Sequence, residues 1–461
     1  MEPFSKPVYI TRPLLPDLNR VKLKLQEVWD SQWLTNMGKQ HNLLEGKLVK
    51  FLKVPNLSLF NNGTIALITA CQSLRLAGEV ITTPFTFAAS PHVLTWNNIK
   101  PIFCDINPET MTIDADKIEA MITPQTTAIL AVHVFGIPCE VDKIQKIANL
   151  YGLNVIYDAA HAFGTEINGT GIGNFGDITM FSFHATKLFH TTEGGALTYK
   201  DPNLKERIYF LKNFGIKNEE EVVMPGINGK MNEIQAVIGL LILELVEEER
   251  KKRKILFDTY RECLKNVEGI KLMDEIEGIR NSYQYFVIRI DKKSSGKSRD
   301  WVHEEFKKYN VFTRKYFYPL CSEYPCYRQL PSSNPSNLPV AHRIVKEVLS
   351  MPFYGGLSTG DVEKICDIFK KFFIGADHYF SVDNAYGGRR YAVFKGYFLD
   401  FKRRGKILRI RKPVSYYRRF KSDDRLIICQ RIFYLFGHNY PAIHGHLLLK
   451  FFFFICPVNK N

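Results

Sequence analysis

The chain has 461 residues, of which 45% are hydrophobic and 24% charged, proportions typical of a soluble protein with two or three domains. No apolar run reaches the roughly 18 residues of a membrane-spanning helix, so we expect no membrane span, and the nine cysteines are too scattered for a disulfide framework or a zinc site. The net charge of +15 does not indicate a nucleic-acid-binding body, because 17 Lys and Arg but only 5 Asp and no Glu fall within residues 375–461.

Short apolar runs alternate with longer amphipathic stretches between residues 57 and 200. The runs include EVITTP, KPIFCDI, TTAILAVHVFG and LNVIYDAAH, and the stretch between the last two repeats its apolar residues at helical spacing. This alternation predicts an α/β fold, with a mainly parallel sheet flanked by helices, for a large domain over residues 1–245 that includes an N-terminal arm. Ligands bind such sheets beyond the carboxyl ends of the strands, so the residues that follow each run are candidates for a site.

The first of these candidates lies in LFNNGTIALITA, residues 59–70. The pattern is an apolar run, a turn at Gly63 and Thr64, and a helix, whose first-turn amides and dipole favour a phosphate group. A strand–turn–helix unit without a ligand has much the same sequence, so both interpretations stay open at this point.

Two charged residues follow later apolar runs. Asp158 ends LNVIYD, where a carboxylate needs a cationic or hydrogen-bonding partner unless it caps the following turn. Lys187 follows DITMFSF; a lysine in an apolar pocket has a lowered pKa and attacks carbonyl groups, whereas a loop lysine can also extend to solvent. An aspartate for a pyridinium nitrogen, a lysine for a Schiff base and a helix N-terminus for a phosphate are together what pyridoxal phosphate requires.

The second half of the chain changes its pattern twice. Residues 231–266 predict one long helix that joins two domains, and residues 246–374 predict a smaller C-terminal α/β domain with a strand at YQYFVIRI. Residues 375–461 form a basic, aromatic-rich tail, which we expect to be poorly ordered or unrelated to the rest of the fold. The alternative for this tail is a segment that binds nucleic acid or a membrane surface, although we expect no nucleic-acid partner for the protein.

Four motifs occur in a recognisable order: TPFTFAAS, DAAHAFG, SFHATK with TEGGA, and GINGKMNEIQA. In this order the sequence resembles the DegT/DnrJ/EryC1/StrS family of sugar aminotransferases, over roughly residues 7–373. The resemblance implies the fold-type-I architecture of enzymes that depend on pyridoxal 5'-phosphate. The resemblance is greatest to the branch of this family that makes nucleotide-linked 4-amino-4,6-dideoxyglucose.

The resemblance also implies a role for each matching residue. Lys187 would be the catalytic lysine that forms the Schiff base, and Asp158 would hold the pyridine nitrogen. Asn228 would reach the cofactor phosphate of the neighbouring subunit, which implies a homodimer with shared active sites, although GINGKM departs from the family pattern YNYRM at Gly229 and Lys230. The remaining cofactor-binding residues would be Gly63, Thr64, Phe87, His161 and Ser182, with His184 and Tyr318 as weaker candidates for contact with the substrate.

The implied activity is the transfer of an amino group from glutamate to C4 of dTDP-4-dehydro-6-deoxy-D-glucose. The product, dTDP-4-amino-4,6-dideoxy-D-glucose, would supply O-antigen or another lipopolysaccharide component. We expect a cytoplasmic protein, since the N-terminus has no basic segment followed by an apolar run. The alternatives are an aminotransferase that acts at C3 of a dTDP-3-dehydro-6-deoxyhexose, and a regulator that binds pyridoxal phosphate without turnover.

Overall fold

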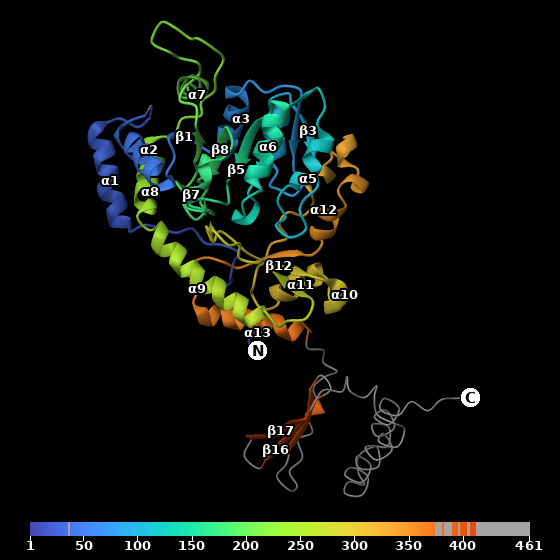
Figure 1. The fold of residues 1–461 in the computed structure, drawn as a ribbon. Helices are drawn as coiled ribbons and strands as arrows, with labels where there is room; N and C mark the ends of the chain where they lie inside the picture. Colours follow the sequence, from blue (N-terminus) through green and yellow to red (C-terminus); the bar gives the residue numbers. More distant parts are fainter. Residues whose placement is uncertain (36, 374–379, 382–389, 395–396, 403–405, 412–461) are drawn as a thin grey trace, which may run out of the picture. The chain divides into compact units, whose positions relative to one another are not determined.

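The fold is built on a seven-stranded sheet, seen in the computed structural model in Figure 1, which describes residues 1–35, 37–373, 380–381, 390–394, 397–402 and 406–411. The strand order is β1-β9-β8-β5-β4-β2-β3. Only β9 runs against its neighbours, so the predicted mainly parallel α/β sheet is confirmed. The strands are β1 (Asn56–Phe60), β2 (Glu79–Thr82), β3 (Lys100–Phe103), β4 (Thr126–Val132), β5 (Asn154–Asp158), β8 (Ile178–Ser182) and β9 (Gly195–Tyr199).

Helices cover both faces of this sheet, which explains why its strands are apolar throughout rather than alternating. In β4, Ala128 and Leu130 pack in one cluster with the helices α3 (Gly63–Ser73) and α4 (Ala89–Trp96). Ile129 and Ala131 point the other way and pack with α6 (Val141–Tyr151). Because successive side chains of a strand face opposite sides, both sets are buried, as a doubly covered parallel sheet requires.

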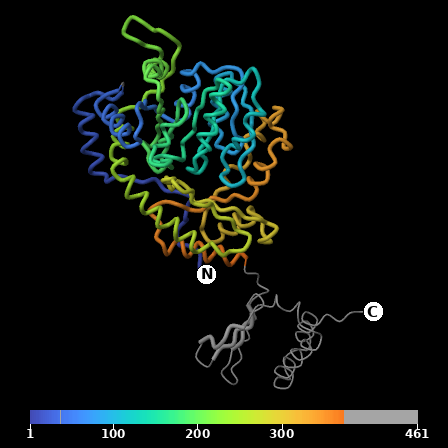
Figure 2. Tube along the Cα trace, in the orientation of Figure 1, coloured from blue at the N-terminus to red at the C-terminus, as the bar shows by residue number. Residues whose placement is uncertain are grey.

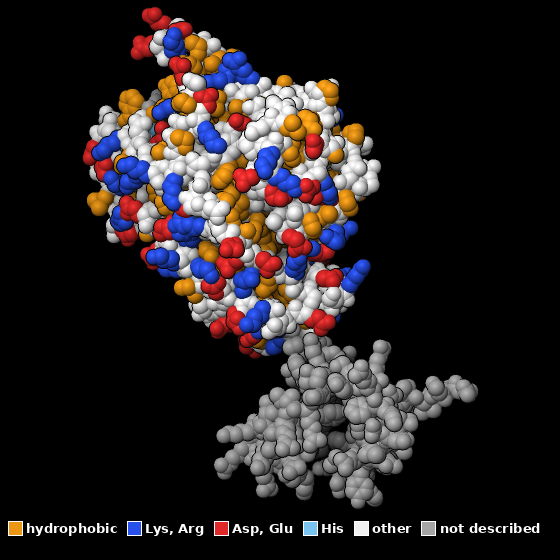
Figure 3. Space-filling model, in the orientation of Figure 1, with side chains coloured by type: hydrophobic (Ala, Val, Ile, Leu, Met, Phe, Trp, Pro, Cys, Tyr) orange, Lys and Arg blue, Asp and Glu red, His pale blue; other side chains and the backbone are white. Residues whose placement is uncertain are grey.

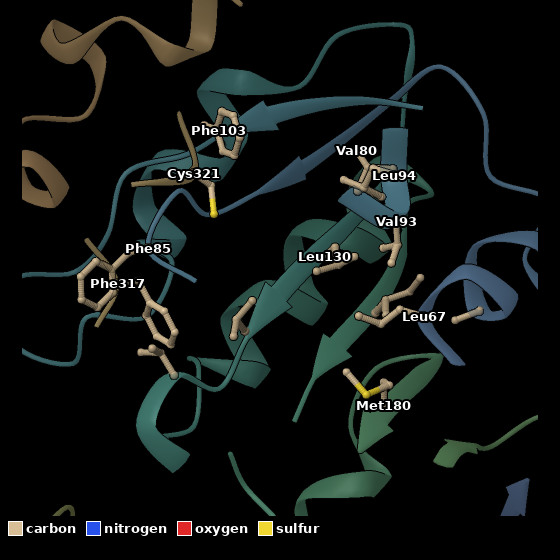
Figure 4. Packing of buried hydrophobic residues seen from close by; sticks show 14 of the residues in the cluster. Leu67, Val80, Phe85, Val93, Leu94, Phe103, Leu130, Met180, Phe317 and Cys321 are labelled. Atoms are coloured by element: carbon tan, nitrogen blue, oxygen red, sulfur yellow. The ribbon is translucent and has the colours of Figure 1, made fainter. Parts of the chain in front are cut away.

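A second, three-stranded sheet lies later in the chain, in the order β10 (Ile270–Leu272), β12 (Phe286–Ile290) and β13 (Val348–Met351). It packs with α9 (Val246–Leu264), α11 (Arg299–Lys307) and α13 (Thr359–Phe373) around a separate apolar cluster. The segment after α11 also extends into the first cluster, where Phe317 and Cys321 lie beside Phe85 and Phe103 (Figure 4). A division into two domains at residue 245 therefore remains a prediction.

The predicted single helix over residues 231–266 is two helices. The first, α8 (Glu233–Leu243), is almost entirely apolar and packs beside α2 (Lys39–Leu52), whereas α9 is strongly charged. Between them Leu245 N donates to Ile242 O, a tight turn that interrupts the regular ladder and redirects the chain. Apart from short 3-10 turns, residues 1–373 also form α1 (Leu18–Ser31), α5 (Ala115–Ile118), α7 (Leu204–Lys212), α10 (Lys292–Ser295), α12 (Pro339–Ile344) and a small sheet of β6 (Glu166–Ile167), β7 (Thr170–Gly171) and β11 (Ile279–Arg280).

The segment between α7 and α8 projects from the body as a long loop (Figures 1 and 2). Elsewhere on the face drawn in Figure 3, lysine and arginine side chains are interspersed with aspartate and glutamate, in keeping with the nearly balanced charge of this part of the sequence. None of the helices that the structure describes has the length and apolar character needed to cross a bilayer.

Residues 374–461 are a second compact unit, separate from residues 1–373. Within it the structure describes an antiparallel sheet of β14 (Phe380–Ser381), β15 (Arg390–Phe394), β16 (Tyr397–Lys402) and β17 (Lys406–Arg411). The rest of the tail for which the sequence predicts poor order lies outside the described residues.

Candidate active site

A tight turn joins β1 to α3 and aims the start of the helix at the carboxyl edge of the sheet. Asn62 caps the helix by accepting a hydrogen bond from Ile65 N at 2.8 Å, while the amides of Gly63 and Thr64 belong to the first turn and point out of it. A Cβ atom at Gly63 would lie 3.2 Å from Cβ of Ser182, so the turn and the end of β8 are in close contact. The structure thus brings Gly63, Thr64 and Ser182 together, in an arrangement that suits a phosphate.

Gly195 makes this close approach possible. It is the first residue of β9 and pairs with Phe60 on one side and Ser182 on the other. A Cβ atom here would lie 2.8 Å from Cα of Gly63, which leaves no room for a side chain. The second glycine of TEGGA therefore lets β9 pass directly beneath the turn.

Asp158 is the last residue of β5 and is buried at the same edge of the sheet. One carboxylate oxygen accepts from Ser90 Oγ at 2.8 Å and the other from Ala160 N at 3.0 Å. Burial raises the pKa of Asp158, while these two hydrogen bonds and the charge of Lys187 oppose the rise. A carboxylate held in this way gains from a further cationic partner, such as a protonated ring nitrogen.

Ser90, which orients Asp158, was not predicted from the sequence. It lies in the first turn of α4, and its hydroxyl also lies 3.0 Å from Thr86 Oγ1. The signal was present, because Ser90 closes the motif TPFTFAAS. Phe87 of the same motif has 63% of its surface exposed, which leaves one face of its ring open to a flat partner.

Lys187 lies in the irregular segment between β8 and β9, and its backbone N–H donates to His184 O at 2.9 Å. Burial lowers the pKa of Lys187 to about 8, and the nearby Asp158 carboxylate and Tyr316 hydroxyl oppose this shift. The amine and the carboxylate are therefore close enough to interact. At neutral to mildly basic pH an appreciable fraction of this amine is uncharged and nucleophilic.

His161 is buried among aromatic rings beside these two residues. Its Nδ1 accepts from Phe135 N at 3.2 Å, and its ring stacks on Phe317 with centroids 5.8 Å apart. Burial, and secondarily the charge of Lys187, hold the pKa of His161 well below its ordinary value. The imidazole is therefore neutral with its proton on Nε2, since Nδ1 is an acceptor.

Two tyrosines of the later part of the chain lie near the lysine, and neither was predicted from the sequence. The ring of Tyr285 lies 5.9 Å from Lys187 Nζ and 4.9 Å from the His161 ring, and Tyr316 packs against Tyr285 at 5.7 Å. Tyr318, the weaker candidate for contact with the substrate, is half-exposed between Arg299 and Lys315, and its contact with the substrate stays a prediction.

Asn228 and His184 lie further out. Asn228 is exposed, its carbonyl oxygen accepts from Asn61 Nδ2 at 3.1 Å, and its side chain accepts from Lys230 Nζ at 3.0 Å. Asn228 and Lys230 line a cavity of about 360 Å³ together with Thr35, Asn61, Asn232 and Gln235. His184 is exposed on the irregular segment of residues 183–194 that carries Lys187, here called the lysine loop, and its Nδ1 lies 2.8 Å from Thr186 Oγ1.

Residues 18–370 match the family described as the DegT/DnrJ/EryC1/StrS aminotransferase family. The chain belongs to this family. It is 47% identical to the dTDP-4-amino-4,6-dideoxy-D-glucose transaminase of Escherichia coli, an alignment that covers 78% of this chain and 97% of that protein. The structure of DesI in the presence of its TDP-sugar product superposes with a TM-score of 0.77 at 35% identity, over 81% of this chain and 94% of DesI.

This aminotransferase depends on pyridoxal phosphate. Another solved relative, the putative sugar aminotransferase Spr1654 of Streptococcus pneumoniae, occurs in a PMP form and a PLP form. Both are 25% identical with a TM-score of 0.73, over 79% of this chain and 98% and 99% of those chains. The residues present fit the cofactor: a helix-starting turn at Gly63 and Thr64 that Gly195 allows to lie directly on β9, a buried carboxylate at Asp158 and an exposed ring at Phe87. Within the described part of the chain no group of three or more His, Cys, Asp and Glu side chains is placed to hold a metal ion.

Proposed function

We propose that this aminotransferase transfers the amino group of glutamate to C4 of dTDP-4-dehydro-6-deoxy-D-glucose and forms dTDP-4-amino-4,6-dideoxy-D-glucose. One observation carries the proposal: 47% identity over nearly the whole length of a transaminase named for that product. The likeness to DesI, solved with a TDP-sugar, supports the same class of nucleotide-linked substrate. The enzyme would act in the cytoplasm, and its amino sugar would supply a surface polysaccharide such as O-antigen.

Each residue at the carboxyl edge of the sheet would have its own role in binding the cofactor or in moving a proton. When bound, pyridoxal phosphate supplies an aldehyde that exchanges amino groups and a ring that takes up the electrons of the broken C–H bond. Lys187 would bind the cofactor and move a proton to and from the substrate carbon, for which its pKa of about 8 is well suited. Asp158 would keep the ring nitrogen protonated. Gly63, Thr64 and Ser182 would bind the phosphate, with Phe87 and His161 against the ring.

A homodimer with shared active sites is part of the proposal. The loop that follows α7 carries apolar side chains that face solvent in the single chain: Phe214, Ile216, Val222, Val223 and Ile227. A cluster of exposed apolar residues on a projecting loop favours burial against another protein surface. In a second copy of this chain the loop would carry Asn228 and Lys230 to the partner's cofactor phosphate or substrate.

The position of amination is tested by product analysis. Purified protein with pyridoxal phosphate and glutamate would be given the 4-keto sugar nucleotide or its 3-keto isomer, and each product identified by NMR. We expect an amine at C4 from the first substrate and little conversion of the second. An amine at C3 would overturn the assignment. Failure of glutamate to convert the cofactor to its pyridoxamine form would favour a binding protein without turnover.

The role of Lys187 is tested separately, by borohydride reduction followed by peptide mapping. We expect the reduced cofactor on Lys187, and no covalent cofactor in Lys187→Ala. Lys205, which is exposed on α7, provides the control variant Lys205→Ala, in which labelling should be unchanged. Labelling of any other lysine in the unmodified protein would contradict the role.

A further inference from the structure

The lysine loop is not held by regular secondary structure. Between Ser182 and Gly195 the backbone forms neither helix nor strand. Within the loop, Phe183 N donates to Gly194 O at 2.8 Å and Thr191 N donates to Phe183 O at 3.0 Å. These bonds close the base of the loop, so the direction of Lys187 depends on what holds the peptide groups beside it.

One buried side chain binds the backbone on both sides of Lys187. The carboxamide of Gln284 accepts a hydrogen bond from Leu188 N at 2.7 Å and donates one to Thr186 O at 3.0 Å. Gln284 is 3% exposed and Leu188 is fully buried, so water does not compete for the Leu188 amide, while the bond to Thr186 O is partly buried. A buried peptide group that loses its only partner is costly, and Gln284 therefore restricts both residues that flank the lysine.

The residues around Gln284 contact the same site. Ser282 Oγ donates to His161 O at 2.8 Å, and Tyr285 packs against His161 and Lys187 Nζ. The segment 282–285 is in turn anchored to α9, because Arg253 Nη1 donates to Tyr283 O at 3.4 Å. Arg253 itself is buried and paired with Glu249 at 2.7 Å. The lysine is thus held from outside the seven-stranded sheet.

We propose that Gln284 is a positioning residue for Lys187, which fixes the backbone on both sides of it and so holds the amine in its reacting direction. The inference rests on the proposed role of Lys187. A carboxamide suits this task because it combines an acceptor and a donor in one planar group. An ionised glutamate would keep the acceptor for Leu188 N but could not donate to Thr186 O, and leucine would offer neither.

The test uses Gln284→Leu and Gln284→Glu in the full chain, with Gln329→Leu as a matched control on an exposed glutamine. We expect kcat to fall on the order of 10- to 100-fold in Gln284→Leu and by a smaller factor in Gln284→Glu, with KM for the sugar nucleotide changed by less than about threefold. The control should match the unmodified protein.

Two measurements on the protein without cofactor separate positioning from a general loss of stability. Hydrogen exchange at the Leu188 amide should be at least tenfold faster in Gln284→Leu, while exchange in the strands of the large sheet is unchanged. The pH dependence of acylation at Lys187, followed by mass spectrometry, should shift to higher pH as the freed loop admits water to the amine.

The outcomes distinguish this inference from the proposed function. If Lys187→Ala still takes up the cofactor covalently, the proposed role of Lys187 fails, whatever the Gln284 variants do. If Lys187 is the labelled lysine but a folded Gln284→Leu keeps its kcat and its Leu188 protection, the inference is overturned. Should Gln284→Leu not fold, Gln284→Glu decides in the same way at a pH high enough to ionise its carboxyl, because a full kcat there would contradict a need for the donor.

Discussion

Burial and charge act on the amine of Lys187 in opposite directions. Burial lowers its pKa to about 8, and the interaction with Asp158 is too weak to restore the ordinary value of 10.5. Below pH 8 the amine is mostly protonated and cannot attack an aldehyde. We therefore predict that attachment of pyridoxal phosphate to the cofactor-free protein accelerates about tenfold per pH unit up to about pH 8 and then levels off.

Stopped-flow absorbance after mixing protein and cofactor would measure this profile, with Lys187→Ala as the variant that should show no attachment phase. An unburied lysine would give a rate that still rises tenfold per unit between pH 9 and pH 10. That result would contradict the predicted effect of burial.

The position of a residue that directly follows a strand could be predicted from the sequence. The position of a residue that is held by contacts between distant segments could not. Asp158 follows an apolar run directly, so its position at the edge of the sheet required only the alternation of strands and helices. Gln284 lies 97 positions after Lys187 and Ser90 lies 68 before Asp158, and their hydrogen bonds depend on how distant segments pack. The strand pattern around Gln284 did not indicate which backbone groups its side chain would contact.

At the scale of the element, the departure of GINGKM from the family pattern has a physical reason. Gly229 O accepts from Asn61 N and Gly229 N donates to Lys212 O, both at 2.9 Å. This loop therefore lies against the turn between β1 and α3 (residues 61–64), here called the phosphate turn. A Cβ atom at Gly229 would lie 2.9 Å from Cγ2 of Ile65, in the first turn of α3. Beneath it the buried Lys212 donates to Leu59 O at 3.0 Å.

We predict that Gly229→Ala weakens cofactor binding by displacing the first turn of α3. Overpacking at such a contact costs on the order of 1–3 kcal/mol, which corresponds to a rise in the Kd for pyridoxal phosphate of about 5- to 150-fold. Gly46→Ala is the control, because a Cβ at Gly46 meets nothing within 4 Å on the exposed side of α2. Fluorescence titration of both variants would test this, and an unchanged Kd for Gly229→Ala would show that the turn adjusts freely.

Element types were easier to predict than element ends. The strands of the sheet follow from apolar runs bounded by turn residues, but the break between α8 and α9 does not follow from the helical period, which continues through it. The break coincides with a change of character, since α8 is almost entirely apolar and packs beside α2 whereas α9 is strongly charged. Sequence periodicity records which face is apolar, not where neighbouring elements force a change of direction.

At the scale of the whole molecule, the proposed dimer requires that Asn228 contacts the cofactor of the partner subunit rather than the cofactor of its own chain. Within one chain its backbone already touches the phosphate turn through Asn61, yet its side chain lies at the base of a loop with exposed apolar residues. If the proposed dimer shares its sites, Lys187→Ala and Asn228→Ala disable different halves of the same site. Mixed dimers would then contain one intact site.

We therefore predict that equal amounts of the two inactive variants, refolded together, recover about a quarter of the wild-type activity, since half of the dimers are mixed and each has one complete site. Each variant refolded alone is the control and should stay inactive or nearly so. If Asn228 instead contacts the cofactor of its own chain, every mixed dimer has one active site without the lysine and one active site without the asparagine. Refolding the variants together then restores no activity. Activity measured against the mixing ratio, with its maximum at equal amounts, separates the two arrangements without any assumption about the sugar.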